Sequence, residues 1–97
     1  MFARLSICIM KSETIDEAMT LYKESVLPVV KLQRGFSGVN YLNDLKTGKM
    51  ITITFWDTVE NIIANEESGY YQDQLDKFKD IFTEPPLREV YEVGIHE

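Results

Sequence analysis

Polar side chains that could bind a ligand alternate with apolar ones along two expected strands. Arg4 and Ser6 share a face of the first strand, and Thr52 and Thr54 share a face of a later one. That later face ends in Trp56, the chain's single tryptophan. Arg4 could bind a ligand and Trp56 could form a pocket wall. Two structural alternatives stay open, because Arg4 could form a surface or interface salt bridge and Trp56 could plug the core or an interface.

The other reactive side chains favour structural roles. Cys8 lies alone in an apolar alternation, which predicts a buried and inert thiol. One cysteine and one histidine make no Cys/His zinc site, and no acidic spacing resembles a calcium loop, so no metal site is predicted. His96 is penultimate, which favours a mobile surface group. A buried tyrosine hydroxyl needs a hydrogen-bond partner, and the chain has five tyrosines: Tyr22, Tyr41, Tyr70, Tyr71 and Tyr91.

Size and composition predict one globular domain spanning residues 1–97. Hydrophobic residues make up 44% of the chain and charged residues 27%, which is typical of a folded protein. The net charge of −6, with scattered Lys and Arg, argues against nucleic-acid binding because phosphates need a basic surface. No apolar run approaches the roughly 20 residues of a spanning helix, and the N-terminal segment lacks a signal-peptide pattern. We therefore expect no membrane association and a cytoplasmic location.

The first half of the chain is expected to form a strand, a helix and a hairpin. Residues 2–10 alternate as a strand, and "TIDE" places Thr14 and Glu17 as a capping box at the start of a helix. Pro28 should kink this helix near its end, and Gly35 should stop it. The segment "FSGVNYLNDLKTGKMITITFW" then indicates two strands joined by a turn rich in Asn, Asp, Thr and Gly.

The second half is expected to add two helices and a last strand. "DTVE" places Asp57 as a helix cap with Glu60 three residues later. A break at Ser68–Gly69 separates this short helix from a longer one, which Pro85 and Pro86 end. The longer helix carries an apolar stripe expected to face the core: Tyr71, Leu75, Phe78 and Phe82. "LREVYEVGI" forms the last strand.

This order of elements predicts an α+β, ferredoxin-like fold. Its split β-α-β-β-α-β unit is a four-stranded antiparallel sheet with the helices on one face, and the first strand lies beside the third. Apolar residues occupy both faces, because Ile51, Ile53 and Phe55 point one way while Met50 and Trp56 point the other. The alternation does not decide which face meets the helices. Since an uncovered apolar face is typical of an interface, we expect a homodimer packed through the sheet face.

Several short motifs, in this order, resemble the antibiotic biosynthesis monooxygenase (ABM) family. They are "RGFSG" after the first helix, a Lys-Thr-Gly hairpin, the strand tryptophan followed by "DTVENIIAN", then "YYQDQL" and "PPLREVYEV". The resemblance covers essentially the whole chain. It implies a dimeric α+β barrel, and a family that contains cofactor-free monooxygenases together with haem-degrading relatives.

The resemblance also implies a chemistry that asks little of the protein. A deprotonated phenol or quinol can itself pass an electron to dioxygen, so the protein supplies a dry aromatic pocket between sheet and helices. No cofactor is then expected, and the ligand would be a small aromatic or quinol-type molecule. A non-catalytic dimeric barrel that binds a small ligand is the alternative function.

Residue by residue, the resemblance points to Asn65 and Tyr70 as catalytic candidates. Relatives often carry a histidine nine residues after the strand tryptophan, where this chain has Asn65, which cannot accept a proton near neutral pH. Tyr70 occupies a second polar aromatic position. The haem-degrading relatives use an axial histidine on the same helix, which this chain lacks, so haem degradation is not the expected reaction. Arg4, Ser6, Thr52, Thr54 and Trp56 are the expected substrate-binding residues.

Overall fold

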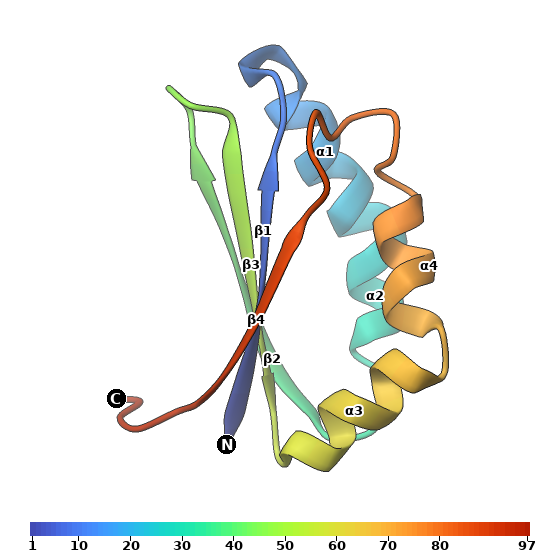
Figure 1. Ribbon diagram of the computed structural model, residues 1–97, viewed down its shortest axis with the longest axis vertical. Coiled ribbons are helices and arrows are strands. Elements are labelled where there is room, and N and C mark those ends of the chain that lie inside the picture. The colour runs from blue at the N-terminus through green and yellow to red at the C-terminus, as the bar shows by residue number, and fades with distance from the viewer.

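The sheet is antiparallel throughout and lies against a layer of helices on one face (Figure 1). This computed structural model describes residues 1–97. The strands, in the sheet order β2-β3-β1-β4, are β1 Phe2–Ile9, β2 Phe36–Asp44, β3 Lys49–Trp56 and β4 Leu87–Glu92. The predicted α+β, ferredoxin-like arrangement is confirmed, including the pairing of the first strand with the third.

The helical layer consists of two helical rods, each interrupted along its length. The first runs through α1 Ile15–Leu21, a π-helical stretch Tyr22–Val26 and α2 Leu27–Val30, and the second through α3 Val59–Glu67 and α4 Tyr70–Asp76. Pro28 lies in the first turn of α2, directly after the π-helical stretch. Proline lacks an amide hydrogen and its ring crowds the carbonyl four residues earlier, and the wider π turn lies where that crowding acts. None of the helices has the length and apolar character needed to cross a bilayer.

Two predicted helix caps are wrong in detail. The side chain of Thr14 donates to a preceding backbone carbonyl and makes no capping bond, so the expected box with Glu17 does not form. The cap of α3 is Thr58 and not Asp57: Thr58 Oγ1 accepts from the backbone N–H of Asn61 at 3.1 Å. Both Asp and Thr are strong cap residues, and the backbone of Thr58 is the extended one that a cap requires.

The second rod is shorter than the sequence predicted. It breaks at Gly69, as expected, where φ is +86° and a left-handed conformation favours glycine. However, α4 ends at Asp76, well before the prolines. Phe82 therefore lies outside the helix and pairs with Met10 through an isolated β-bridge. The chain between α4 and β4 is thus held against the C-terminal end of β1, where the backbone N–H of Thr83 also donates to the carbonyl of Ile9.

The hairpin turn between β2 and β3 forms where predicted, and it depends on Asp44 at its start and Gly48 at its end. Asp44 Oδ1 accepts backbone N–H bonds from Lys46 at 2.9 Å and Thr47 at 3.3 Å. Gly48 has φ +76°, and a Cβ there would lie 1.8 Å from the carbonyl oxygen of Met10. Only glycine meets both conditions.

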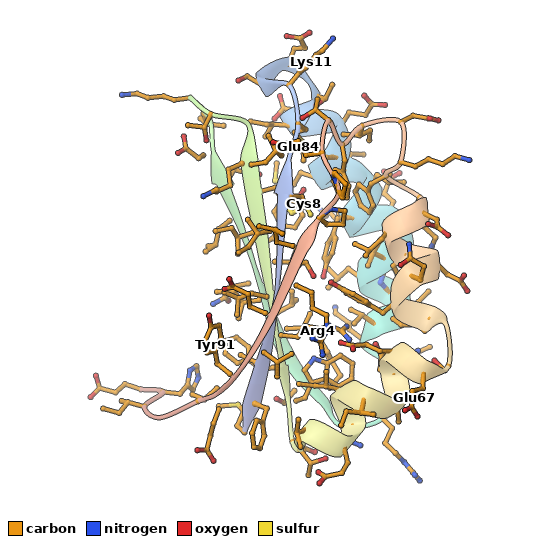
Figure 2. The ribbon with its side chains drawn as sticks, viewed as in Figure 1. Arg4, Cys8, Lys11, Glu67, Glu84 and Tyr91 are labelled. Carbon is orange, nitrogen blue, oxygen red and sulfur yellow. The ribbon has the colours of Figure 1, made fainter.

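The sheet face that meets the helices is the more polar one. The shared core cluster consists of Cys8, Met10, Ile15, Ala18, Tyr22, Val26, Met50 and Phe78. Figure 2 shows Arg4 and Cys8 between the sheet and the helices, with Tyr91 on the opposite, uncovered side. On that open face Leu42, Leu87 and Tyr91 are exposed, and the isoleucines of β1 and β3 are only partly covered.

Candidate functional site

Four polar side chains form a buried strip across the centre of the sheet. Arg4 of β1 lies opposite Thr54 of β3, and Ser6 lies opposite Thr52. All four are buried on the helix-covered face. This arrangement decides between the two sheet faces that the sequence left open, because the strip lies under the helices.

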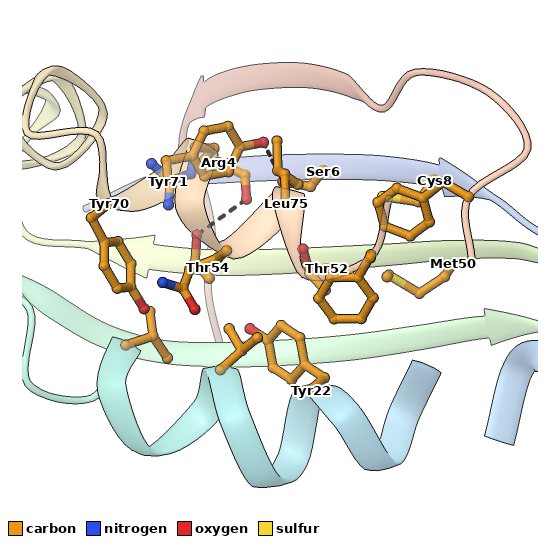
Figure 3. A pocket seen from close by; sticks show the side chains of 15 residues that line it. Arg4, Ser6, Cys8, Tyr22, Met50, Thr52, Thr54, Tyr70, Tyr71 and Leu75 are labelled. Carbon is orange, nitrogen blue, oxygen red and sulfur yellow. Dashed lines mark hydrogen bonds between the residues drawn. The ribbon is translucent and has the colours of Figure 1, made fainter. Parts of the chain in front are cut away.

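The polar strip forms one wall of a small cavity between the sheet and the helices (Figure 3). Its volume is about 50 Å³, and apolar side chains such as Cys8 and Phe78 line the other end. Arg4, Ser6, Thr52, Thr54 and Tyr70 all border this space, so the structure brings five of the seven predicted site residues together. A space of this size has room for a few water molecules at its polar wall.

Arg4 is the most unusual group in the cavity wall, with only 3% of the residue exposed. Its Nη1 donates to Asn65 Oδ1 at 3.0 Å and to Glu66 Oε2 at 3.3 Å. Its guanidinium carbon lies 4.0 Å from the ring centre of Tyr71 and 5.1 Å from that of Trp56. Arg4 is therefore a buried cation between two rings, and the surface salt-bridge interpretation is wrong.

The cavity wall carries more positive than negative charge. Glu66 Oε2 is also held by Arg88 Nε of β4 at 2.6 Å, so a single carboxylate faces two guanidinium groups. Burial lowers the pKa of Arg4, which Tyr71 and Glu66 partly offset. Arginine nevertheless stays charged at neutral pH. The cluster of Arg4, Glu66 and Arg88 thus has a net charge of +1, and Arg4 is its only member that lines the cavity.

Arg4 also keeps hydrogen-bonding capacity for a ligand. A guanidinium has five N–H groups, and the two contacts of Arg4 within the chain both come from Nη1. The Nε and Nη2 groups make no hydrogen bond to another part of the chain. Since Arg4 borders the cavity, these donors are the available anchor for an oxyanion.

Three tyrosines surround the cavity with neutral phenols. The hydroxyl groups of Tyr71 and Ser6 are 2.6 Å apart, and either can be the donor. Burial raises the pKa of Tyr70 and of Tyr71, and it raises the pKa of Tyr22 to about 12. The hydroxyl of Tyr70 and Gln74 Oε1 are buried without a hydrogen-bond partner, and both residues line the cavity. The phenols can therefore donate hydrogen bonds to a ligand but are poor proton acceptors at neutral pH.

Trp56 and Asn65 stand directly behind the cavity wall and do not line it. Trp56 is fully buried, and its Nε1 donates to Thr54 Oγ1 at 2.9 Å. Asn65 accepts from Arg4 and donates through Nδ2 to Gln33 Oε1 at 3.1 Å. Both residues thus hold the polar strip in place.

Sequence reasoning missed Glu66, Arg88 and Gln74, and it placed Tyr71 in the core. Charged residues on a helix and on an edge strand usually indicate solvent-facing positions. Only the register supplied a signal, because Arg88 of β4 pairs with Ser6 and must share its face. Of the remaining reactive groups, the Cys8 thiol lines the apolar end of the cavity, and burial raises its pKa to about 12. His96 lies against Phe55 of the open face. No group of three or more His, Cys, Asp or Glu side chains could hold a metal ion.

The sequence matches no family model and no curated protein. Solved structures with the same architecture include a putative antibiotic biosynthesis monooxygenase from Deinococcus radiodurans, with TM-score 0.78, 15% identity, and 100% of this chain and 96% of that chain covered. The fold is that of the antibiotic biosynthesis monooxygenases.

Two further ABM-fold structures contain ligands. The haem degrader MhuD from Mycobacterium tuberculosis, with two haems in its active site, has TM-score 0.79 and 14% identity, and 100% of this chain and 99% of MhuD are covered. The monooxygenase ActVA-Orf6 of Streptomyces coelicolor, in complex with nanaomycin D, has TM-score 0.74 and 14% identity, with 99% and 91% covered.

Proposed function

We propose that this protein is a cofactor-independent, monooxygenase-like enzyme that binds the anionic form of a small aromatic or quinol-type molecule. The observation that carries the proposal is the buried guanidinium of Arg4, with N–H groups free to meet a ligand. A buried cation held against an apolar cavity stabilises a phenolate far more than water-exposed lysines or arginines do. The ABM fold, shared with ActVA-Orf6 in its complex with nanaomycin D, supports a small-molecule ligand.

In this proposal the substrate anion performs the redox step. The phenolate transfers one electron to dioxygen, and the resulting radical and superoxide combine through a new C–O bond. After protonation, the peroxide loses one water molecule and leaves a quinone, so the substrate loses two hydrogens and gains one oxygen atom. Arg4 stabilises the negative charge of the phenolate, while the hydroxyls of Ser6 and Thr52 orient the ligand through its oxygen and the apolar end excludes water.

The proposal assigns no protein group as a strong base. Tyr70 and Tyr71 have raised pKa values, so both stay protonated at neutral pH. Tyr70, whose hydroxyl has no partner, donates to the bound substrate or peroxide. Asn65 positions Arg4 through the 3.0 Å contact. Deprotonation is therefore favoured because Arg4 lowers the pKa of the bound substrate.

Oxygen uptake and ligand binding, measured together, test this function. Quinols and polycyclic phenols are added to the protein while dissolved oxygen and Trp56 fluorescence are recorded, since Trp56 contacts Arg4 directly. Both signals should respond to the same compounds, and the matching methyl ethers should give neither. Binding without oxygen consumption would reject catalysis and support the alternative, a non-catalytic ligand-binding barrel. A parallel haem titration with a Soret shift would instead favour the reaction of MhuD.

We also propose that two copies pack through their open sheet faces, in the manner of a dimeric α+β barrel. The open face is the more apolar of the two, with Leu5, Ile7 and Ile53 partly exposed and Leu87 at 63% exposure. A single chain would leave this surface in water. Size-exclusion chromatography with light scattering should give a dimer for the wild type and a monomer for Ile53→Lys. A monomeric wild type would reject the interface. The cytoplasm remains the proposed location.

A further inference from the structure

Tyr71 belongs to two cavities at once. It lines the small cavity beside Arg4, and it also lines an open groove of about 680 Å³ between α4, the 77–86 segment and β4. Leu75 and Phe82 are shared in the same way. These three side chains therefore form the wall that separates the inner cavity from the groove.

The contacts of Tyr71 are those expected of a phenolic ligand. Its ring covers the guanidinium of Arg4 with a 4.0 Å separation, and its hydroxyl lies 2.6 Å from Ser6 Oγ (Figure 3). A ring on a cation and a phenol on a hydroxyl are the two interactions by which this wall can recognise an aromatic alcohol. The side chain thus occupies the most polar part of the binding wall.

The remaining space is too small for a ring. The inner cavity measures about 50 Å³, whereas an apolar cavity that accepts benzene measures about 150 Å³. An aromatic ligand can therefore reach Arg4 only if a wall residue moves. Among the shared wall residues, Tyr71 alone contacts Arg4.

We propose that Tyr71 occupies a ring-binding subsite and swings into the groove when a phenolic ligand takes its place. The ligand's ring then lies on Arg4, its hydroxyl or oxyanion meets Ser6, and the rest of the molecule extends into the groove. The site is therefore selective for phenols over hydrocarbons of the same size. This inference rests on the proposed function for its ligand class but requires no catalysis.

The surroundings of Tyr71 permit this movement. No residue of helix α4 is fully buried, and its inward-facing residues are only half-buried, so α4 packs less tightly than the core. It begins after Gly69, where a substituent would meet no atom within 4 Å, so the chain has open space at the start of the helix. A modest shift of α4 and a rotation of one side chain would join the cavity to the groove.

Replacement of Tyr71 tests the subsite directly. In Tyr71→Ala the vacated space should accept phenol at least about tenfold more tightly than toluene, because only phenol restores the contacts to Arg4 and Ser6. Leu75→Ala is the matched control, since it opens the same wall one helical turn away and leaves Arg4 covered. Dissociation constants are measured anaerobically by calorimetry and Trp56 fluorescence, with folding checked by circular dichroism.

The outcomes separate cleanly. Three results would overturn the proposal. Tyr71→Ala binds phenol and toluene with equal affinity, the Leu75→Ala control binds phenol as tightly as Tyr71→Ala does, or a folded Tyr71→Ala binds neither compound. If Tyr71→Ala does not fold, Tyr71→Phe decides. In Tyr71→Phe the side chain loses its hydrogen bond to Ser6 and should be displaced more easily, so phenol should bind about fivefold more tightly than to the wild type. Unchanged or weaker binding would refute the proposed movement of Tyr71.

Failure of the proposed function would leave a different signature. Selective phenol binding by Tyr71→Ala, with no oxygen consumption by the wild type on any quinol, would keep the subsite and reject the monooxygenase reaction. Oxygen consumption by the wild type without selective binding in Tyr71→Ala would keep the monooxygenase reaction and reject the subsite.

Discussion

Replacement of Arg4 by methionine should separate stability from ligand binding. Taking a guanidinium out of water costs several kcal/mol, and Arg4 is 3% exposed. Its favourable contacts are one shared carboxylate, one amide oxygen and two rings. Removal of one partner from a fully buried ion pair usually costs about 3–5 kcal/mol. Here, however, Glu66 is partly exposed and keeps Arg88 as its partner, so the main terms are the desolvation of Arg4 and the contacts that Arg4 loses.

The balance predicts that Arg4→Met changes the free energy of unfolding by no more than about 1 kcal/mol in either direction. Removal of the cation relieves its desolvation, but it leaves Asn65 Oδ1 without its donor, at a cost of about 1–3 kcal/mol. Loss of the two ring contacts costs about 0.5–2 kcal/mol each. Anion binding should fall by at least about tenfold, since a charged hydrogen bond contributes about 1.5–3 kcal/mol.

Glu66→Gln should give the opposite pattern. It leaves Arg4 and Arg88 without a carboxylate, which should destabilise the fold by about 1–3 kcal/mol, less than for a fully buried pair because the Glu66 side chain is 23% exposed. The uncompensated charge should tighten phenolate binding. Urea denaturation at a fixed protein concentration, followed by Trp56 fluorescence, measures both stabilities. A loss of more than about 3 kcal/mol in Arg4→Met, with ligand affinity retained, would show that Arg4 is a structural residue and refute the reasoning.

Three further predictions concern stability. Burial raises the pKa of Tyr22 and Tyr41 from 10.0 to about 12, so the unfolded chain releases these protons first. Stability should therefore be fully present below pH 10 and fall as the pH rises toward 12, which alkaline melting curves would show; a flat profile would contradict the burial of both phenols. Gly69→Ala should cost about 1–2 kcal/mol from backbone strain alone, whereas Gly48→Ala adds a clash with a backbone carbonyl and should cost at least about twice as much. Comparable melting temperatures for the two variants would argue against that close approach. Trp56→Phe should lose the indole hydrogen bond to the strand threonine and some packing, about 2 kcal/mol in all, and a variant as stable as wild type would show that the indole bond contributes nothing.

The alternation of residue types was enough to predict the strands and the hairpin, and the order of strands and helices along the chain predicted the sheet topology. It could not decide which face the helices cover, because burial of apolar residues favours the wrong answer. The face with Ile51 and Ile53 is the more apolar, yet the helices cover Arg4, Ser6 and Thr52. A dimer explains the reversal if the more apolar face is reserved for the second copy.

The polar residues of the site on the strands were predicted, but their partners on other elements were not. Residues with period two on a strand must share a face, so the polar strip could be derived from spacing alone. The partners of Arg4 could not, since Glu66 and Arg88 come from elements whose relative placement depends on tertiary packing. Tyr71 fits a helical core stripe in the sequence, and its ring meets Arg4 only in the folded structure.

The central claim is that the Arg4 wall binds an aromatic anion, and the pKa of a bound phenol tests it most directly. The phenolate of 4-nitrophenol absorbs visible light that the neutral form does not, so a spectrophotometric pH titration reports the charge of the bound molecule. With wild-type protein the pKa of bound 4-nitrophenol should fall below that of the free compound, because the cation favours the anion. With Arg4→Met the shift should vanish. A bound pKa equal to or above the free value in the wild type would contradict the account.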